Sequence, residues 1–394
     1  MSDIANGYTQ FLEAAREVEA IIRAHPGTTD ADLAEGYHYL SGMWIFHVER
    51  AFKSYDVDRP AFVRDMDNVR TWGLPTPDHH YYSAQIDGAG VYRLFGNRGT
   101  TVDYCFELVS GLAGDDGVVG DRIGVLESSR LQIEADGHFE LWIGGPERPG
   151  NWMPCDQRAR CLFVRQTVND WLTEQPTPML IERMDRPTPI PRRPALADVQ
   201  KLYAIAAKNM VDQVRFLDDF AQNWGKILPV NAYPAPSVGP ADAGYFPGQY
   251  NTKGRWEVPA GKALVITIEP NDARYQSLAL AHPLWFNSLS PRSVQSSITG
   301  AQSLASSDGR FRYVIAGEDP GIWNWLDTTG ITSGFIFMRF QQLASRTPPG
   351  APRTRLVSLA SVRDEFPADE PRVSPTERQA ISRLRRLSAD RRYA

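Results

Sequence analysis

Apolar residues in the first 70 positions recur every three or four residues, which is the spacing of one buried helix face. A first helix is predicted to stop at His25-Pro26-Gly27, and Thr29 or Asp30 can cap a second helix. The apolar stripe of the second helix consists of Leu33, Tyr37, Leu40, Trp44, Val48 and Phe52. This pattern predicts an N-terminal helical segment over residues 1–74.

Two further helices are predicted from start and stop signals. Pro60 is favoured in a first helical turn and Gly73 just after a helix end, so a third, short helix is expected between them. The proline-rich stretch 184–195 cannot continue a strand and is predicted to be a connector. A long amphipathic helix follows over about 196–224, within a linker-and-helix segment that spans 184–244.

From about Tyr81 the apolar period shortens towards two, as it does in strands with one buried face. The strand-like runs are residues 91–96, 101–109, 129–135, 138–144 and 160–168. Asp136-Gly137, between two of these runs, is a two-residue hairpin signal. Strands and helices do not alternate here, which favours a mostly antiparallel β domain over 75–183.

A second set of strand-like runs lies within 245–342. These runs are residues 263–269, 275–281, 292–298, 310–317 and 334–341. Pro270-Asn271-Asp272, between the first two, resembles a hairpin turn. Many short strands at this spacing favour a sandwich or a jelly roll. The predicted fold class is therefore α+β, with N-terminal helices, two mostly antiparallel β domains joined by a long helix, and a helical tail.

The tail, residues 343–394, ends in a helix that opens with a capping box. Ser374 and Glu377 form the box, and Pro375 stands at the favoured first helical position. A narrow apolar edge follows, made of Ile381, Leu384 and Leu387, together with six arginines between Arg378 and Arg392. We expect the helix to dock by its apolar edge with its arginines in solvent. An anionic partner for the arginine face is the alternative.

Composition narrows the classes of function. The chain has 394 residues, enough for two or three domains, and a net charge of -5, which argues against a nucleic-acid partner. It shows no basic-then-apolar leader and no run of about 18 apolar residues, so we expect a cytoplasmic protein without a membrane span. Cys105, Cys155 and Cys161 form no CxxC pair, which suits a reducing compartment and argues against structural zinc.

Common cofactor and hydrolase motifs are absent from the sequence. It lacks GxGxxG, GxxxxGKS/T, GxSxG and HExxH. His38 and His47 lie nine residues apart on one predicted helix, so they face opposite sides and cannot share a metal. We therefore predict neither a cofactor nor a metal site.

The first candidate site is the run Asp78-His79-His80-Tyr81-Tyr82, which can supply a general base and a donor for an oxyanion. In a strand, His80 and Tyr82 share one face, and His79 and Tyr81 share the other. We assign acid–base chemistry to Asp78, His80 and Tyr82. The alternative is a half-buried strand entry whose polar groups are satisfied within the fold.

Two further candidates involve arginines and tryptophans. Arg98, next to a glycine in a predicted turn, can present its guanidinium to a carboxylate or phosphate, or it can be a solvated hairpin residue. Arg274 stands in an acidic turn, and downstream the chain reads Trp323-Asn324-Trp325-Leu326-Asp327. Aromatic walls with a few polar groups are typical of a ligand pocket. Buried tryptophans beside an internal Asp–Arg pair are the alternative.

Six unusual runs occur in order along the chain: TPDHHYYSAQID, YRLFGNRG, GNWMPCDQRARCLFVRQTVNDWLTEQP, EPNDARYQSLALAHPLW, VQSSITGAQ and EDPGIWNWLDTTG. Together they resemble the bacterial family catalogued as domain of unknown function 1214. The resemblance covers most of the chain from about residue 70 to 341 and implies a protein with two β domains, related to the 1254 family. It brings no established reaction. The family often shows Asn-Pro-Asp-Asn before a tyrosine, and of the corresponding residues here Asp78 fits better than His79 or His80.

These patterns lead us to expect a small-molecule enzyme or accessory protein of lipid or secondary metabolism. It would hold an apolar ligand with hydroxyl or carboxyl groups between the β domains. The predicted ligand-binding residues are Arg98, Arg274, Trp285, Gln295, Trp323, Asn324, Trp325 and Asp327. A non-catalytic carbohydrate or lipid-binding module is the alternative, and the sequence leaves catalysis itself open. The expected partner is a small molecule, and a homo-oligomer is compatible with the sequence.

Overall fold

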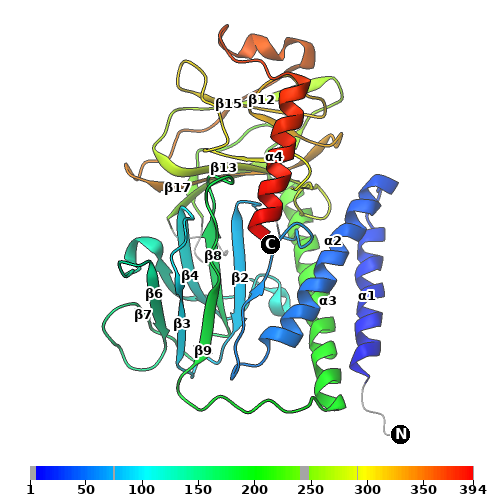
Figure 1. Ribbon diagram of the computed structural model, residues 1–394. Helices are drawn as coiled ribbons and strands as arrows, with labels where there is room; N and C mark the ends of the chain where they lie inside the picture. The colour runs from blue at the N-terminus through cyan, green and yellow to red at the C-terminus, as the bar shows by residue number, and fades with distance from the viewer. Residues whose placement is uncertain (1–5, 74–75, 240–247, 291, 394) are drawn as a thin grey trace.

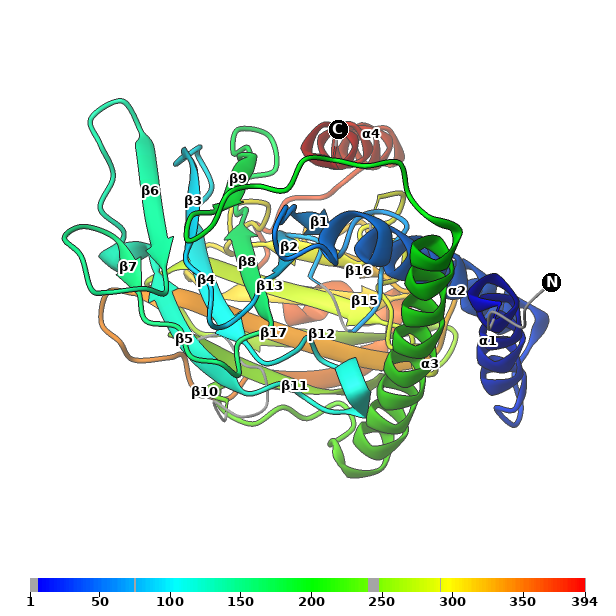
Figure 2. The same cartoon turned by 90° about the horizontal axis from the view of Figure 1, so that it is seen from below.

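The computed structural model describes residues 6–73, 76–239, 248–290 and 292–393. It confirms the α+β class, because two β domains lie one above the other with helices along one side (Figure 1). Figure 2 shows from below that the long helix α3, Leu196–Ile227, runs beside the strands of both domains. Within the described part of the chain, no helix has the length and apolar character needed to cross a membrane.

Three helices form a layer beside the β domains. They are α1 (Gly7–Arg23), α2 (Asp30–Glu49), which continues as a π-helical turn (Arg50–Ser54), and α3. Thr29 caps α2, since its side chain accepts a hydrogen bond from the Asp32 amide and the Asp32 carboxylate accepts one from the Thr29 amide. The predicted N-terminal helices and the long helix are confirmed, although the expected helix between Pro60 and Gly73 is wrong. That segment contains strand β1 (Val63–Arg64) and turns.

The buried face of α2 differs from the predicted stripe. Tyr37, Trp44 and Phe52 of that stripe are exposed, whereas the buried residues of the helix are Gly36, Tyr39, Leu40, Gly42, Met43, Phe46 and His47. Two glycines mark the packed side. A Cβ atom on Gly42 would lie 2.4 Å from the Val69 carbonyl oxygen, so only glycine allows the chain to come this close. The prediction that the aromatic residues mark the buried face of α2 is therefore wrong, and Gly36 and Gly42 mark that face instead.

The first β domain is a sandwich of two sheets with strand orders β1-β2-β8-β4-β5 and β7-β6-β3-β9. Its remaining strands are β2 (His79–Gln85), β3 (Tyr92–Asn97), β4 (Asp103–Val109), β5 (Arg122–Glu127), β6 (His138–Ile143), β7 (Trp152–Met153), β8 (Cys161–Thr167) and β9 (Met179–Arg183). Phe106, Leu141 and Val164 belong to the core between the two sheets. The strand expected over 129–135 is wrong, because a 3-10 turn and irregular chain occupy it.

The second β domain is also a two-sheet sandwich, with orders β10-β11-β17-β13-β14 and β16-β15-β12-β18. Its strands are β10 (Ser237–Val238), β11 (Gln249–Glu257), β12 (Lys262–Ile268), β13 (Ala273–Ala281), β14 (Ser297–Thr299), β15 (Phe311–Ala316), β16 (Trp325–Asp327), β17 (Ser333–Leu343) and β18 (Arg353–Ser358). The turn at 270–272 does not close a hairpin. It carries the chain from β12 in one sheet to β13 in the other, so the two strands pair with different neighbours.

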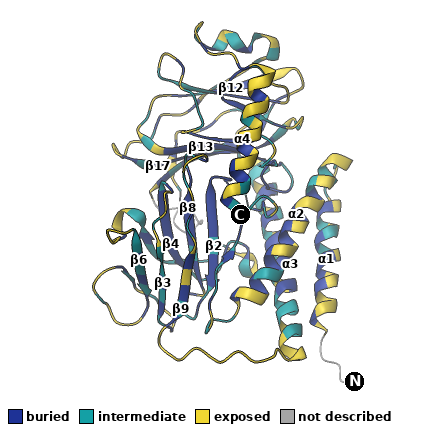
Figure 3. Ribbon diagram, viewed as in Figure 1, coloured by how far each residue is buried: buried dark blue, intermediate teal, exposed yellow. Residues whose placement is uncertain are grey.

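The sheets that face each other across the two domains are buried on both sides. In Figure 3, β2, β4 and β8 are dark blue along most of their length. One face of this sheet lies in the core of the first domain, and the other packs against helices and the second domain. In the second domain β17 is buried in the same way, with Met338 in the sandwich core and Phe337 in a cluster with α3.

The C-terminal helix α4, Pro375–Tyr393, opens with the predicted capping box. Its docking face differs from the expected one, because Leu384 and Leu387 are 47% and 41% exposed while Arg378, Arg385 and Arg392 are buried. These three arginines are seven residues apart and therefore share one helix face. They contact the protein itself, since Arg378 pairs with Asp319 and Arg385 donates to backbone oxygens of Val294 and Ser297.

Arg392 ties the end of α4 to the first β domain. Its guanidinium lies 3.8 Å from the ring centre of Trp171 and donates a 3.0 Å hydrogen bond to the Pro77 carbonyl oxygen. A desolvated cation over an indole contributes about 2 kcal/mol, and a hydrogen bond from a charged donor about 1.5–3 kcal/mol. Helix α4 therefore docks through its arginine face, and the predicted docking through its apolar edge is wrong.

We expect Arg392→Ala to lower the free energy of unfolding by about 2–4 kcal/mol, because it removes both contacts. Arg383→Ala, on the exposed side of the same helix, should change it by less than about 0.5 kcal/mol. Urea unfolding of the two variants measures the difference. Equal effects would contradict docking through the arginine face.

Candidate functional site

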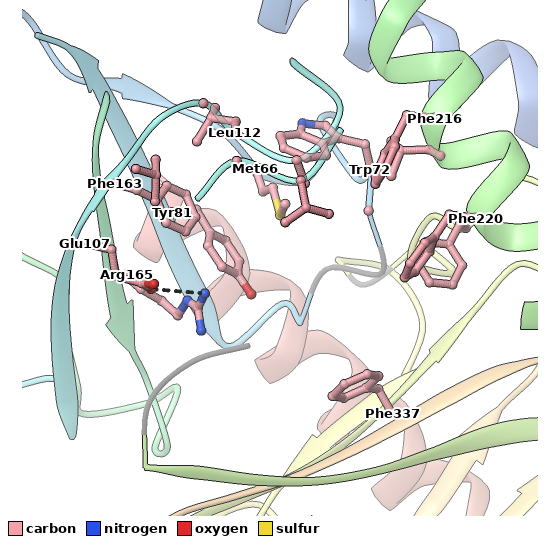
Figure 4. A pocket seen from close by; sticks show the side chains of 18 of the residues that line it. Met66, Trp72, Tyr81, Glu107, Leu112, Phe163, Arg165, Phe216, Phe220 and Phe337 are labelled. Atoms are coloured by element: carbon pink, nitrogen blue, oxygen red, sulfur yellow. Dashed lines mark ion pairs between the residues drawn. The ribbon is translucent and has the colours of Figure 1, made fainter. Parts of the chain in front are cut away.

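A cavity of about 260 Å³ lies where the two β domains and α3 meet. Its lining residues come from β2, β4 and β8 of the first domain, from β11 and β17 of the second, and from α3. Figure 4 shows these side chains pointing into one space. This inter-domain cavity matches the location that the sequence predicts for a ligand, between the β domains.

The first-domain wall is set by strand pairing. Tyr81 of β2 is paired with Arg165 of β8, and Phe163 of β8 with Glu107 of β4. Alternation along each strand sends these four side chains to the cavity, while their neighbour Val164 enters the sandwich core. The wall therefore combines two aromatic rings with one cation and one anion.

The second-domain wall faces it from β17 and β11. Phe337 and Arg339 are alternate residues of β17, and Gln249 stands on the adjoining strand β11. Helix α3 closes one side with Phe216, Phe220 and Trp224. Apolar walls with a few polar groups are what a small-molecule site requires, since the walls bury the ligand and the polar groups orient it.

Buried charges give the cavity its electrostatic character. Glu107 forms ion pairs with Arg122 at 2.8 Å and with Arg165 at 3.7 Å, all within the first domain. Arg339 lies on the opposite wall, where burial lowers the pKa of its guanidinium and the positive charge of Arg165 lowers it further. The described lining residues thus carry two guanidiniums and one carboxylate.

A polar chain leads from the cavity wall into the domain interface. The Tyr81 hydroxyl lies 3.0 Å from Nδ1 of His79, and Nε2 of His79 lies 3.5 Å from the Gln341 amide nitrogen. Burial lowers the pKa of His79 well below its ordinary value, and the nearby arginines lower it further, so the imidazole is neutral near pH 7. A neutral imidazole can accept the hydroxyl proton of Tyr81, which fixes the phenol at the cavity wall.

Asp78 lies at this interface but outside the cavity lining. Its carboxylate accepts hydrogen bonds from the Trp171 indole at 2.8 Å and from the Tyr275 hydroxyl at 3.1 Å. Tyr275 belongs to β13 of the second domain, so Asp78 joins the two β domains directly. The ring of Tyr275 also lies beside that of His79, with ring centres 5.4 Å apart. Asp78, His79 and Tyr81 are therefore brought together, with Tyr275 between the first two.

His80 and Tyr82 face the other side of β2, as strand alternation requires. His80 is fully buried, with Nε2 3.3 Å from the Arg392 guanidinium and its ring tilted against that of Tyr393. The Tyr82 ring lies under the Arg64 guanidinium at 5.8 Å. Neither side chain lines the cavity.

Three other predicted ligand residues also lie away from the cavity. The Arg98 guanidinium lies over the ring of Tyr104 at 4.3 Å, and the Arg274 side chain is exposed. Trp285 is buried in the helical layer, where its indole donates a 2.8 Å hydrogen bond to the Asp32 carbonyl oxygen. The carbonyl oxygen of Arg274 contributes to the domain interface, where it accepts a 2.9 Å hydrogen bond from the Asn169 side chain.

The remaining five predicted ligand residues gather at one end of the second domain. They are Gln295, Trp323, Asn324, Trp325 and Asp327, and hydrogen bonds hold them together. The Asn324 amide donates to the carbonyl oxygens of Leu304 and Arg312, and the Asp327 carboxylate accepts from the Thr329 amide. The Trp325 indole is buried under Arg378, whereas Trp323 is 38% exposed. These contacts are internal to the fold and lie apart from the cavity lining.

Sequence reasoning missed both cavity arginines. Each is a lone charge inside an otherwise apolar strand run, CLFVRQT for Arg165 and GFIFMRF for Arg339. A charge in such a run must be buried, and buried charges are rare without a structural or functional reason. That signal was available before the structure. The sequence gives no comparable signal for the role of α3, because periodicity does not reveal which strands a helix covers.

No group of three His, Cys, Asp or Glu side chains among the described residues could hold a metal ion.

A second buried carboxylate supports the cavity wall from behind. Asp65 accepts a 2.6 Å hydrogen bond from the Ser83 hydroxyl, and its carbonyl oxygen accepts one from the indole of Trp72, a cavity residue. Burial raises the pKa of Asp65 to about 7. The hydrogen bond from Ser83 and the charges of Arg50 and Arg70 lower this pKa, but the effect of burial is larger. The folded protein therefore holds this proton over a range where an unfolded chain, with a pKa of about 3.9, releases it.

We expect Asp78→Asn to lower the free energy of unfolding by about 1–3 kcal/mol, because an amide offers one acceptor oxygen to two buried donors. Asp327→Asn is the matched control, since its amide oxygen can keep the single hydrogen bond from Thr329. Urea unfolding at pH 7 compares the two. A loss confined to Asp327→Asn would refute the interface role of Asp78.

Asp65 predicts a pH dependence with a defined sign. Its stabilising contribution is complete below the unfolded pKa and is lost as pH rises through about 7. Asp65→Asn carries no charge, so its stability relative to the parent should increase by up to about 1.4 kcal/mol per pH unit between pH 5 and pH 7. Unfolding curves at pH 5, 6, 7 and 8 measure this, and a constant difference would contradict it.

Comparisons with known proteins identify the fold. No family model and no curated protein matches this sequence. The chain is similar to the crystal structure of an uncharacterized protein from Burkholderia cenocepacia, with a TM-score of 0.81 and 28% identity over 90% of this chain and 98% of that chain. The VPA0106 protein from Vibrio parahaemolyticus aligns over 90% of this chain and 99% of that chain, with 10% identity and a TM-score of 0.45. The arrangement of helices and two β domains is thus shared with the Burkholderia protein across nearly its whole length.

Proposed function

We propose that this protein binds a compact, mostly apolar molecule with a carboxyl or hydroxyl group in the inter-domain cavity, as a small-molecule enzyme or accessory protein. The observation that carries the proposal is the convergence of Arg165 and Arg339 from two domains on one aromatic-walled space. Burying a guanidinium is costly, and buried charged groups that line a cavity are candidates for a functional site. Membership of the family of unknown function 1214 stays a prediction alongside this.

Acid–base chemistry, if the protein is an enzyme, would involve Tyr81 held by His79. Tyr81 is the hydroxyl on the cavity wall, and the neutral imidazole beside it positions that hydroxyl through a hydrogen bond. The predicted acid–base roles of Asp78, His80 and Tyr82 stay predictions. Of these three residues, Asp78 is joined to Tyr81 through the contacts of Tyr275 and His79. A lipid or secondary-metabolic substrate fits the apolar walls. All three cysteines are free thiols, which suits the proposed cytoplasmic location.

A carbohydrate or lipid-binding module remains the second candidate, carried by the exposed indole of Trp323. Such modules use aromatic platforms on the surface, and Trp323 is the exposed member of its cluster. The two candidates place the ligand at different ends of the molecule, so one experiment separates them.

The experiment is native mass spectrometry of protein purified from its own cells. We expect the parent to carry a small molecule that Ala113→Trp lacks, because an indole at this lining position fills the cavity. Trp323→Ala is the control and should retain the molecule. Loss on Trp323→Ala with retention on Ala113→Trp would favour the surface module. Equal melting temperatures of the three proteins would show that each remains folded.

A further inference from the structure

Large apolar side chains gather in solvent on helices α1 and α2, at the edge of the molecule away from the cavity (Figure 1). Five of them, each 38–48% exposed, form what is called the helical face: Tyr8 and Leu12 of α1, Tyr37 and Trp44 of α2, and Phe52 of the turn after α2. We propose that the helical face is the interface of a two-fold dimer, in which α2 packs antiparallel to α2 of a second copy across Ser41.

Ring contacts join the helical face into one surface. The half-buried ring of Tyr203, from α3, lies edge-on to Tyr8 at 5.2 Å and to Phe52 at 5.0 Å. Phe11 of α1 lies 5.9 Å from the ring of Tyr203 and 6.5 Å from that of Trp44. Rings held in this way lose little freedom when a partner covers them, and tryptophans and tyrosines commonly supply most of the binding energy of an interface.

The exposed side of α2 is uncharged as well as apolar. Residues 33–48 contain a single charged residue, Glu35, and it lies about 200° round the helix from Tyr37. Tyr37, Ser41 and Trp44 are spaced by four and then three residues, so they share one side of the helix. The opposite side is already buried in the fold. A helix that is apolar on all sides is normally covered on all sides, so we expect a partner to cover the exposed side of α2.

Two hydroxyls at the centre of this surface are already hydrogen-bonded. The Tyr37 hydroxyl donates to Glu19 at 2.7 Å and accepts from Arg23. The Ser41 hydroxyl donates to the Tyr37 carbonyl oxygen at 2.9 Å. Covering these hydroxyls therefore leaves neither without a partner, which avoids the main penalty of burying polar groups. The small side chain of Ser41 between two large rings also leaves a hollow that a ring of the second copy can fill.

The area of the helical face suits a stable dimer. At about 200 Å² for a large side chain, the exposed fractions of its five residues leave about 400 Å² of mostly apolar surface. A standard interface buries about 800 Å² on each partner, and a little over half of that area is apolar. The helical face therefore supplies nearly all the apolar area that one side of such an interface needs.

A second copy matches this surface better than a charged partner does. A two-fold axis near Ser41 places Trp44 of each copy opposite Tyr37 of the other, so the contact is self-complementary. Antiparallel α2 helices have opposed dipoles. The uncharged surface brings no like charges together, although each chain has a net charge of -5. The same net charge disfavours the anionic surface of a membrane.

Sedimentation velocity of the full chain measures the association. We expect a species of twice the chain mass, with a dissociation constant of about 1 µM or lower. Trp44→Glu should raise this constant at least about 100-fold, because two-fold symmetry buries the new charge twice. Leu384→Glu is the matched control, since Leu384 is 47% exposed on α4, and it should leave the constant within about twofold of the parent.

Ser41→Cys tests the antiparallel pairing. Oxidation should link two chains through a disulfide, because the two-fold axis brings the two Cα atoms within about 7 Å of each other. Ser382→Cys, at an exposed position of α4, is the control and should stay unlinked. The parent, whose three cysteines are free thiols, should also stay unlinked.

Circular dichroism checks that each variant is folded. If Trp44→Glu does not fold, Leu12→Glu tests the same face from α1 and should raise the dissociation constant at least about tenfold. A parent that is monomeric at about 50 µM would overturn the proposal, as would a dimer that both charge substitutions leave intact. A dimer in which Ser41→Cys does not link would refute the antiparallel pairing. A monomeric parent that floats with phosphatidylcholine vesicles would assign the helical face to a membrane instead.

Discussion

The structure depends on a sheet that is buried on both faces. Strands β2, β8 and β4 contribute one side of every strand to the first sandwich core and the other side to the contact with helices and the second domain. A sheet in this position has no solvent face on which to place its polar residues. Each polar side chain on it must therefore be paired within the interface or open onto the cavity, as Glu107 and Arg165 do.

The same constraint explains why the interface between the domains is polar while the sandwich cores are apolar. Gln341 of β17 reaches across to the row that holds His79 and Thr167, and Asp78 accepts the Tyr275 hydroxyl from the second domain. These directional contacts set the register of the two domains, which hydrophobic packing alone would leave imprecise. The cavity opens next to these contacts, and Arg165 and Arg339 line it from the two facing sheets.

Local elements could be predicted from the sequence because local rules decide them. The cap at Thr29, the box at Ser374 and Glu377, and the strands around Arg165 and Arg339 all follow from neighbouring residues. Contacts that join distant segments could not be predicted in the same way. The turn at 270–272 looks like a hairpin, and only the pairing of β12 with β15 and β18 shows that it crosses between sheets.

The sequence predicts a ligand between the β domains, where the structure has a cavity, but none of the predicted site residues lines that cavity. Motif reasoning favoured clusters of chemically versatile side chains, and these clusters are mostly internal supports, as the hydrogen bonds of Asn324 illustrate. We predicted catalytic roles for His80 and Tyr82, which share one face of strand β2. The cavity lies on the other face, which carries His79 and Tyr81. Strand alternation predicts which residues share a face. Which face meets the second domain depends on how the two domains pack, and the local sequence does not show this.

Helix α4 shows how the position of the cavity walls is maintained from outside. Its arginines contact the second domain through Arg378 and Arg385 and the first domain through Arg392, so the helix spans the joint between them. Arg392 and Arg385 both lie over the ring of Trp171, whose indole donates to Asp78. Asp78 in turn binds Tyr275 beside His79, which holds Tyr81 at the cavity. An unbroken series of contacts thus joins the C-terminal helix to the cavity wall, and the spacing of Arg165 and Arg339 depends on the same domain joint that this helix secures.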